Sequence, residues 1–462
     1  MTTNFENGLF IFRRDLRIID NNGLNLLNDK CKNIYTIFIF TPEQVGSGNK
    51  YKSDNSVQFM IESLQHLASQ ISKAGGHLYT FYGHNDTVVA DCIKAWNINL
   101  VCFNLDITPY AKERDAKIIK MCEHKKTYVM YDYDYYLHQP GTILNGSSEP
   151  YQKFTPYYQT ALKHKVESPA KMKKLHLKRS DAHISNKITL EQSMKKFVGS
   201  ENTDILVHGG RPEAVKTLKT AVRTQSHYSK NHNDLEKQTT QLSAYIKFGC
   251  VSIREVYKAL RGKTDIIRQL IWRDFYANIL YSFPRVLGHA LKPNYDKIHW
   301  HHNKTWFDKW CKGETGFPIV DAGMRQLNAT GYMHNRARLI VASFLVKTLL
   351  IDWREGEEYF ASKLTDYDVA SNNGNWQWVA STGADSQPFF RIFNPWEQAK
   401  NYDPKCEYIK KWVPELKDVP DKDILKWETE YETHKDIKYP KPIVDYKKQK
   451  DLALKMLGAA FK

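Results

Sequence analysis

Short apolar runs recur through the first third of the chain, and longer polar stretches separate them. Each run has the length of a buried strand, whereas the residues between the runs follow a helical period. The helical period is clearest over Ser56–Ala74, where apolar residues recur at intervals that place them on one face. The predicted strands are Gly8–Phe12, Ile34–Phe40, His77–Tyr82, Asn99–Phe103 and Thr127–Met130.

Strands and helices that alternate in this way predict a parallel sheet covered by helices on both faces. We therefore expect an α/β, Rossmann-like domain over residues 1–132. In such a domain a ligand binds at the carboxyl ends of the strands.

The pattern changes twice further along the chain. Residues 133–204 are rich in Tyr, Pro, Gly, Ser and Lys, which is typical of a connector on the surface. After Gly209 the helical period returns, and Pro212 and Glu213 suit the first turn of a helix. We expect an all-helical domain over residues 205–462.

Composition supports a folded protein of more than one domain. The chain has 462 residues, of which 42% are hydrophobic and 26% are charged, so neither a disordered chain nor a single small module fits. Seven cysteines are scattered without any Cys-x-x-Cys pair. We expect reduced thiols and no structural metal.

The net charge of +16 indicates a polyanionic partner. Nucleic acid is the first candidate and an anionic membrane surface is the second. No stretch approaches the roughly 20 apolar residues of a membrane-spanning helix, and Met1–Gly8 lacks the features of a secretory signal. We expect an intracellular protein, with cytoplasm and nucleus both left open.

Two segments in the second half combine polar and aromatic side chains. Gly331–Arg338 places amide and guanidinium donors at a predicted helix start, although a solvated basic face would look similar. Asp366–Trp378 contains acids, amides and indoles in one short run. It is too polar for a core and too aromatic for an ordinary loop, so it suits a polar, planar ligand.

At these residues the chain resembles the photolyase and cryptochrome flavoprotein family, most closely the class I cyclobutane pyrimidine dimer (CPD) photolyases. The resemblance extends over nearly the whole chain. It implies the same two domains, with FAD held in the helical one. The matching segments are Phe12–Arg17, Pro150–Pro156, Leu242–Gly249, Ile271–Tyr276, Gly316–Arg325 and the chain from Asp352 onward.

The resemblance assigns a set of residues to FAD. Hydroxyl and backbone donors would meet the phosphates, and charged or amide side chains would meet the flavin ring. Without the resemblance, the Thr/Ser stretch would pass for a helix cap. The phosphate segment is Thr239, Thr240, Leu242 and Ser243, and Tyr228 and Arg273 lie near the cofactor. Arg338 and Asp366 form an ion pair at the flavin ring. Asp368 approaches flavin N3 or the ribose, and Asn372 faces flavin N5.

Asn372 bears on the kind of activity. A carboxamide is neutral and can donate and accept hydrogen bonds, so it can serve N5 with or without a proton. Plant cryptochromes carry Asp at this position and animal cryptochromes carry Cys. Asn therefore favours repair over signalling.

The resemblance also implies an electron route and a DNA face. Trp376, Trp353 and Trp300 match the tryptophan chain that carries an electron to photoexcited flavin, with Trp300 outermost. Two indoles would wall a pocket for the extruded dimer and replace lost base stacking. The DNA-facing positions are Trp272, Trp378, Asn335, Arg336 and Gln398. The reaction implied is electron transfer from photoexcited FADH⁻ to a dimer in UV-damaged DNA, by a monomer that binds no membrane.

Two positions depart from the class I pattern. Gln269 stands where a glutamate usually meets the thymine edges, and Leu339 replaces a methionine expected to touch the dimer. Gln at this position is seen in (6-4) photolyases. However, the segment His334–Leu339 lacks two histidines of the (6-4) pattern. CPD repair is the first hypothesis and (6-4) repair is the alternative.

Three further alternatives concern chromophores and class. Asn104–Ala111 lies where an antenna chromophore, a folate or a deazaflavin, would sit, but the glutamate that marks folate binding is not clearly present. The presence and identity of an antenna stay open. A blue-light receptor without repair activity and a colourless basic DNA-binding scaffold are the rival hypotheses.

Overall fold

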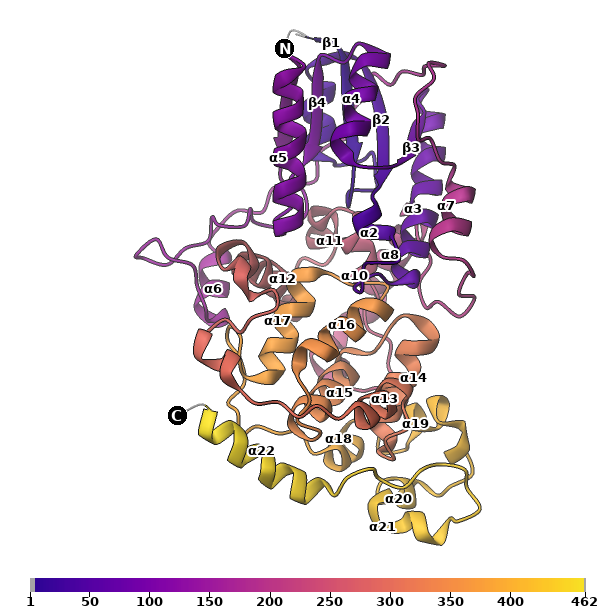
Figure 1. Ribbon diagram of the computed structural model, residues 1–462, viewed down its shortest axis with the longest axis vertical. Coiled ribbons are helices and arrows are strands. Elements are labelled where there is room, and N and C mark those ends of the chain that lie inside the picture. Colours follow the sequence, from indigo (N-terminus) through magenta and orange to yellow (C-terminus); the bar gives the residue numbers. More distant parts are fainter. Residues whose placement is uncertain (1–4, 461–462) are drawn as a thin grey trace.

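A five-stranded parallel sheet forms one end of the molecule in the computed structural model, which describes residues 5–460 (Figure 1). The strand order is β3-β2-β1-β4-β5. β1 lies at the centre, and the chain winds outwards from it in both directions, so the predicted doubly wound sheet is confirmed. The strands are β1 (Phe5–Phe12), β2 (Cys31–Phe40), β3 (Leu78–Tyr82), β4 (Leu100–Asn104) and β5 (Tyr128–Asp132).

Helices cover both faces of this sheet. Phe10 and Phe12 of β1 belong to the same buried cluster as the apolar residues of α1 and α3. Leu9 and Ile11 point to the other face and pack with α4 and α5. Because both faces are buried, the strands read as nearly continuous apolar runs. These helices are α1 (Asn22–Asn28), α3 (Asp54–Lys73), α4 (Asn85–Trp96) and α5 (Pro109–His124), and α2 (Pro42–Val45) is a short turn of helix after β2.

Residues 133–204 contact both parts of the molecule and contain two helices, α6 (Phe154–Ala161) and α7 (Leu190–Phe197). α6 packs on the helical part, whereas α7 packs on α3 beside the sheet (Figure 1). This segment covers the outer edge of β3, where the Tyr82 backbone N–H donates to the Asn186 carbonyl (2.9 Å). Such bonds pair backbone groups that an edge strand would otherwise leave free.

The rest of the molecule is helical, and within the described residues no strand follows β5. The predicted helical domain is therefore confirmed. In the part of the chain that the structure describes, no helix is both long and apolar enough to cross a membrane. The longer helices are α8 (Arg211–Thr224), α12 (Thr264–Ser282), α13 (Lys304–Lys312), α14 (Pro318–Thr330), α15 (Asn335–Lys347), α16 (Trp353–Lys363), α17 (Val369–Ala380), α18 (Pro395–Tyr402) and α22 (Tyr446–Ala460). The shorter ones are α9 (Tyr228–Asn231), α10 (Ser243–Lys247), α11 (Ile253–Ala259), α19 (Glu407–Trp412), α20 (Asp421–Ile424) and α21 (Trp427–Glu430), and 3₁₀ turns lie at Gln225–His227, Pro284–Val286, Pro293–Lys297, Pro414–Leu416 and Tyr431–Thr433.

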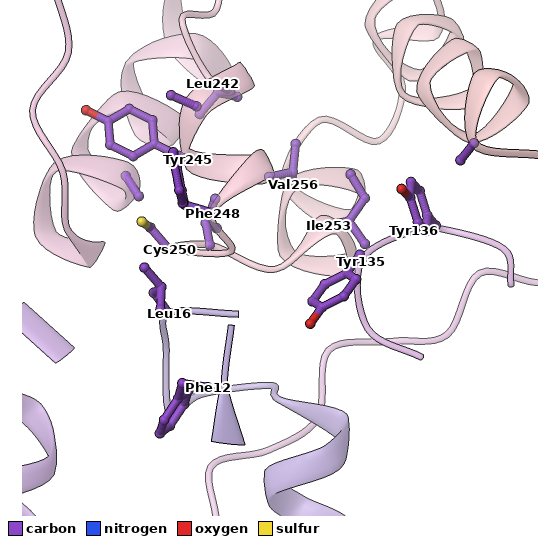
Figure 2. Close-up of a cluster of buried hydrophobic side chains, with 14 of the residues drawn as sticks. Phe12, Leu16, Tyr135, Tyr136, Leu242, Tyr245, Phe248, Cys250, Ile253 and Val256 are labelled. Carbon is purple, nitrogen blue, oxygen red and sulfur yellow. The ribbon is translucent and has the colours of Figure 1, made fainter. Parts of the chain in front are cut away.

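One hydrophobic cluster joins the sheet part to the helical part. Figure 2 shows Leu16 of the sheet part opposite Cys250 of the helical part, and Phe12 and Phe248 belong to the same cluster. All four side chains are buried. The Leu16 backbone N–H also donates to the Phe248 carbonyl (3.0 Å), so the two backbones are directly bonded.

Buried charges reinforce this junction. Arg17 and Asp134 form an ion pair at 2.5 Å, and both side chains are almost fully excluded from solvent. Arg254 of α11 pairs with Asp134 (2.7 Å) and with Asp20 (3.0 Å). Removing one member of such a network would leave a buried charge uncompensated, which keeps the two parts in one arrangement.

Candidate functional site

A cavity of about 480 Å³ lies between α10, α12, α15 and α17, and we call it the helical cavity. Its volume is in the usual range for a small-molecule or cofactor site. Most of the residues predicted to bind FAD or the lesion line it. They are Tyr228, Thr240, Leu242, Ser243, Gln269, Trp272, Arg273, Asn335, Arg338, Leu339, Asp366, Asp368, Asn372, Trp376 and Trp378.

Two of the helices that form the wall of the helical cavity begin at a residue whose side chain caps the helix. Asp368 caps α17, because its Oδ1 accepts the Ser371 backbone N–H (3.0 Å). His334 caps α15 in the same way, with Nδ1 accepting the Arg336 N–H (3.1 Å). Asn372 and Trp376 are four residues apart on α17 and both line the cavity, as the helical period requires.

Arg338 and Asp366 form an ion pair at the cavity wall. Arg338 Nη2 lies 2.9 Å from Asp366 Oδ2, and its Nε donates to the Met333 carbonyl (2.9 Å). Burial alone would lower the pKa of Arg338, but Asp366 and the Tyr332 phenol together outweigh burial and raise it. Asp366 Oδ1 is buried and has no partner among the described residues. Asp366 Oδ1 is therefore available to accept a hydrogen bond from a bound molecule.

Asn372 is fixed by a second helix. Its Nδ2 donates to the backbone carbonyl of Glu357 on α16 (3.0 Å). The Glu357 carboxyl is buried and accepts the Asn373 Nδ2 (2.9 Å). Burial raises the pKa of Glu357 to about 7, against the opposing effect of that hydrogen bond. The carboxamide of Asn372 is thus held by the backbone of Glu357, and the side chain of that residue bonds to the neighbouring Asn373.

The three tryptophans of the predicted electron route are all buried in one cluster. Trp300 is 8% exposed, Trp376 2% and Trp353 1%, so Trp300 is the most accessible of the three. The backbone N–H of His301 donates to the carbonyl of Leu350 (2.7 Å), which brings Trp300 near the start of α16. Of the three, only Trp376 lines the helical cavity.

An aromatic stack supports one wall of the predicted lesion pocket. The ring of Trp272 on α12 stacks on Phe154 of α6, with centroids 3.6 Å apart and an interplanar angle of 7°. Phe154 therefore covers one face of Trp272, and the tilted ring of Tyr276 lies 5.5 Å away on the same helix. Trp378 and Gln269 line the same cavity.

Three of the residues predicted to bind FAD or DNA lie outside the wall of the helical cavity. Thr239 Oγ1 lies 3.4 Å from the Tyr332 hydroxyl. Arg336 donates to Asn233 Oδ1 (2.7 Å) and stacks over the Tyr402 ring. Gln398 has a buried Oε1 without a partner among the described residues. The structure does not bring these side chains together with the rest of the site.

Asp368 has partners that the sequence does not reveal. Its Oδ2 receives the Arg14 guanidinium at 2.6 Å, so each of its oxygens is already bonded. Burial opposes ionisation, but Arg14 and Arg273 outweigh it and hold the pKa of Asp368 far below its ordinary value. An acid expected to approach N3 or the ribose is therefore tied to the other part of the molecule.

A second cavity of about 670 Å³ lies between the sheet part and the helical part, and we call it the interdomain cavity. Asp106, Thr108 and Tyr110, within the segment where the resemblance places an antenna, line it. Its wall includes the cations of Lys52 and Arg114. Three residues, Lys247, Tyr367 and Asp368, line both cavities.

Lys247, like Tyr367, is a residue of this shared wall that sequence reasoning missed. Its ammonium lies 3.6 Å from the Phe248 ring centroid and 3.4 Å from Ser56 Oγ. Burial, assisted by Arg14, lowers the pKa of Lys247 to about 7. A single lysine in the run Leu242–Gly249 gives no local sign of such burial.

The helical cavity has the chemistry that FAD requires. FAD carries a flat apolar ring system, an imide edge that donates and accepts hydrogen bonds, and an anionic pyrophosphate. The wall offers the aromatic rings of Tyr228 and Trp376, the hydroxyls of Thr240 and Ser243, and the cation of Arg338. Arg273 Nη2 is a buried donor without a partner among the described residues. We therefore find that these residues fit the cofactor.

Comparisons with known proteins agree with this chemistry. A family model described as the FAD binding domain of DNA photolyase matches residues 266–459. A second model, described as DNA photolyase, matches residues 9–174. The deoxyribodipyrimidine photo-lyase of Halobacterium salinarum is 33% identical over 483 residues, which cover 98% of this chain and 99% of that protein.

Two solved structures share the fold over the whole chain. An archaeal photolyase from Sulfolobus tokodaii, solved with two FAD molecules, has a TM-score of 0.88 at 38% identity, covering 98% of this chain and 100% of its own. A class III photolyase from Agrobacterium tumefaciens has a TM-score of 0.91 at 30% identity, covering 100% of this chain and 99% of its own.

Proposed function

The chain belongs to the DNA photolyase family, and on that premise we propose that it is a deoxyribodipyrimidine photolyase that splits CPDs in UV-damaged DNA. One observation carries the proposal: the helical cavity joins the residues suited to FAD and the indoles suited to a flipped dimer in one wall. When bound as FADH⁻, FAD supplies a light-driven electron to the dimer and recovers it after the cyclobutane bonds break.

The residues of this chain would bind and orient rather than react. Arg338 would neutralise charge at the flavin ring while Asp366 Oδ1 accepts a hydrogen bond from its imide edge. Trp272 and Trp378 would hold the dimer between flat apolar faces, which replaces stacking worth about 1–3 kcal/mol per base. Gln269 and Asn335 would meet the polar edges of the bases.

One structural feature favours CPD repair over (6-4) repair. A (6-4) photolyase needs a proton donor at the lesion. Burial and the neighbouring Arg338 and Arg336 lower the pKa of His334 to about 4, so its ring is neutral at physiological pH. Its Nδ1 already accepts the N–H that caps α15. This histidine is therefore unsuited to give a proton to a lesion.

The proposed function is tested by illuminating the photoreduced protein with lesion-bearing oligonucleotides. Matched strands should carry either a thymine CPD or a (6-4) photoproduct, and the products should be separated by chromatography. We expect light-dependent restoration of the CPD strand only. Repair of the (6-4) strand alone would reverse the choice of lesion. An intact CPD beside a normal flavin spectrum would identify a blue-light receptor, and colourless protein that takes up no FAD would identify a DNA-binding scaffold.

We also propose that the interdomain cavity holds a second chromophore. Its volume and its mixture of aromatic, cationic and acidic lining residues suit a planar, polar molecule. The Sulfolobus tokodaii photolyase, which is similar over the whole chain, was solved with two FAD molecules. Acid extraction of purified protein should therefore yield more than one chromophore per chain after reconstitution with flavin. A ratio of one chromophore per chain after reconstitution with folate, with deazaflavin and with flavin would contradict this proposal.

A further inference from the structure

Arg14 is the side chain that crosses from the sheet part into the wall of the helical cavity. It follows β1, and its guanidinium makes contacts on both sides of the junction. Nη2 donates to Asp368 Oδ2 (2.6 Å), Nη1 to Asp106 Oδ2 (3.1 Å) and Nε to the Lys247 carbonyl (3.3 Å). Only Asp106 belongs to the same part of the molecule as Arg14.

The loop that carries Arg14 is held tightly against the helical part. Gly249, just after α10, has a φ of +65°, and a Cβ at this position would lie 2.5 Å from the Arg14 carbonyl oxygen. Any side chain here would collide with the backbone of Arg14 and Asp15, so this close approach requires glycine. The backbone hydrogen bond from Leu16 to Phe248 holds the same loop two residues after Arg14. Arg14 therefore has little freedom to leave Asp368.

Asp368 in turn determines where α17 begins. Its Oδ1 caps the helix at Ser371, and its backbone carbonyl accepts the Asn372 N–H (2.8 Å). The helix then carries Asn372, Trp376 and Trp378 into the cavity. The Asp368 side chain is 7% exposed, so its charge needs a partner close by. Arg14 is the cation in direct contact with it.

We propose that Arg14 is a positioning residue of the flavin site: it compensates the Asp368 carboxylate and so fixes the start of α17 from the other part of the molecule. This proposal rests on the proposed function, because it assumes that FAD binds in the helical cavity. It adds a residue of the sheet part to a site whose other members belong to the helical part. Arg14 lines the interdomain cavity but not the helical cavity, so its action on a flavin in the helical cavity is indirect and passes through Asp368.

The charges around Asp368 predict a distinct pH dependence once Arg14 is removed. Arg14, Arg273 and Lys247 are the cations that act on it, and the phenols of Tyr136 and Tyr367 face it. With Arg14 present, Asp368 stays ionised throughout the physiological range. Without Arg14, burial raises its pKa, so the cost of keeping it ionised grows as the pH rises.

The test compares Arg14→Gln with Arg325→Gln as a matched control. Arg325 forms a part-buried pair with Glu415 (2.7 Å) and lines neither cavity. Apoprotein is titrated with FAD at pH 6 and pH 8, and flavin fluorescence gives Kd. We expect Arg14→Gln to raise Kd by about tenfold or more at pH 8 and by less at pH 6. Arg325→Gln should leave Kd near the wild-type value, even if it lowers Tm.

A second substitution separates positioning from general damage. Asn is as good a helix cap as Asp but carries no charge. Asp368→Asn added to Arg14→Gln should therefore recover much of the lost affinity at pH 8 and remove the pH dependence. Should Arg14→Gln fail to fold, Arg14→Lys keeps the charge and should show weaker FAD binding that does not change with pH.

Three results would overturn the proposal: a Kd for Arg14→Gln equal to that of wild type, a loss that is the same at both pH values, or no recovery with Asp368→Asn. A wild-type apoprotein that binds no FAD would instead refute the proposed function. The two failures are therefore distinguishable.

Discussion

At the scale of single residues, the site depends on ionisable side chains that burial moves away from their ordinary pKa. Glu357, Lys247 and His334 all lie at or beside the two cavities, and burial is the largest cause of the shift in each. Burial disfavours the charged form, so it raises the pKa of the carboxyl and lowers that of the ammonium and the imidazole. Each shift links folding to pH in a direction that can be measured.

Glu357→Gln should remove one of these links. The folded pKa of Glu357, about 7, exceeds the ordinary value of 4.5, so the folded state binds the proton more tightly. The free energy of unfolding therefore falls as the pH rises from 4.5 through 7, by up to about 3 kcal/mol from this group. Gln keeps an acceptor for Asn373 but does not titrate. Urea denaturation from pH 5 to 8.5 should show the variant gaining stability over wild type as the pH rises. Glu358→Gln on the same helix is the control, and an equal gain there would contradict the assignment.

Trp376→Phe should separate cofactor binding from photoreduction. Trp376 lines the helical cavity and packs against Phe360 (4.9 Å), so an aromatic ring of similar shape should keep the wall intact. Phenylalanine is much harder to oxidise than an indole and would interrupt the proposed electron route. We expect normal FAD content with slower photoreduction, followed by flavin absorbance under blue light. Unchanged kinetics would remove Trp376 from that route.

At the scale of secondary-structure elements, the site depends on how closely α16 approaches α17. Gly356 of α16 lies against the Trp376 ring, and a Cβ at this position would come within 2.2 Å of the indole Cη2. The absence of a side chain on one helix thus makes room for the largest side chain on the other. The contact sets the distance between the helix that carries Glu357 and the helix that carries Asn372.

Gly356→Ala should therefore destabilise the protein despite the better helix propensity of alanine. Propensity favours Ala by about 1 kcal/mol, whereas overpacking costs about 1–3 kcal/mol and would displace Trp376. We expect a lower denaturation midpoint and weaker FAD retention. Gly458→Ala in α22 meets only an ordinary contact at 3.5 Å and should be neutral or slightly stabilising. A Gly356→Ala variant as stable as Gly458→Ala would show that the helices can separate without cost.

At the scale of the whole molecule, the two parts act as one unit because a continuous hydrophobic cluster and a buried ion network join them. The same unit carries a net charge of +16, which agrees with a nucleic-acid partner. The flavin site lies in the helical part, but a residue of the sheet part reaches its wall. The stability of the site should therefore follow the stability of the junction.

DNA affinity should depend steeply on salt while FAD affinity should not. Each phosphate neutralised by a Lys or Arg contributes a slope of about −0.9 to the plot of log K against log salt concentration for duplex DNA. Binding of a UV-irradiated duplex, measured by fluorescence anisotropy from 50 to 300 mM salt (roughly the range in which counterion release is resolved), should weaken strongly. Flavin retention over the same range is the control. A flat response of DNA binding would contradict binding through the phosphate backbone.

Local patterns determined the elements. The apolar runs predicted the five strands, the run Gly331–Arg338 predicted the helix start at α15, and the polar–aromatic run Asp366–Trp378 predicted a site for a polar, planar ligand. Neighbouring residues decide strand length, helix period and capping, so these features are readable along the chain. The motifs that resemble photolyases likewise named most of the residues that line the helical cavity.

Only the tertiary structure showed that Trp272 stacks on Phe154, that Arg336 turns to Asn233 instead of the cavity, and that Arg14 pairs with Asp368 across 354 positions of sequence. The burial of a side chain and its ion-pair or stacking partners depend on residues that the fold brings together from distant positions. The sequence of one segment does not identify those partners.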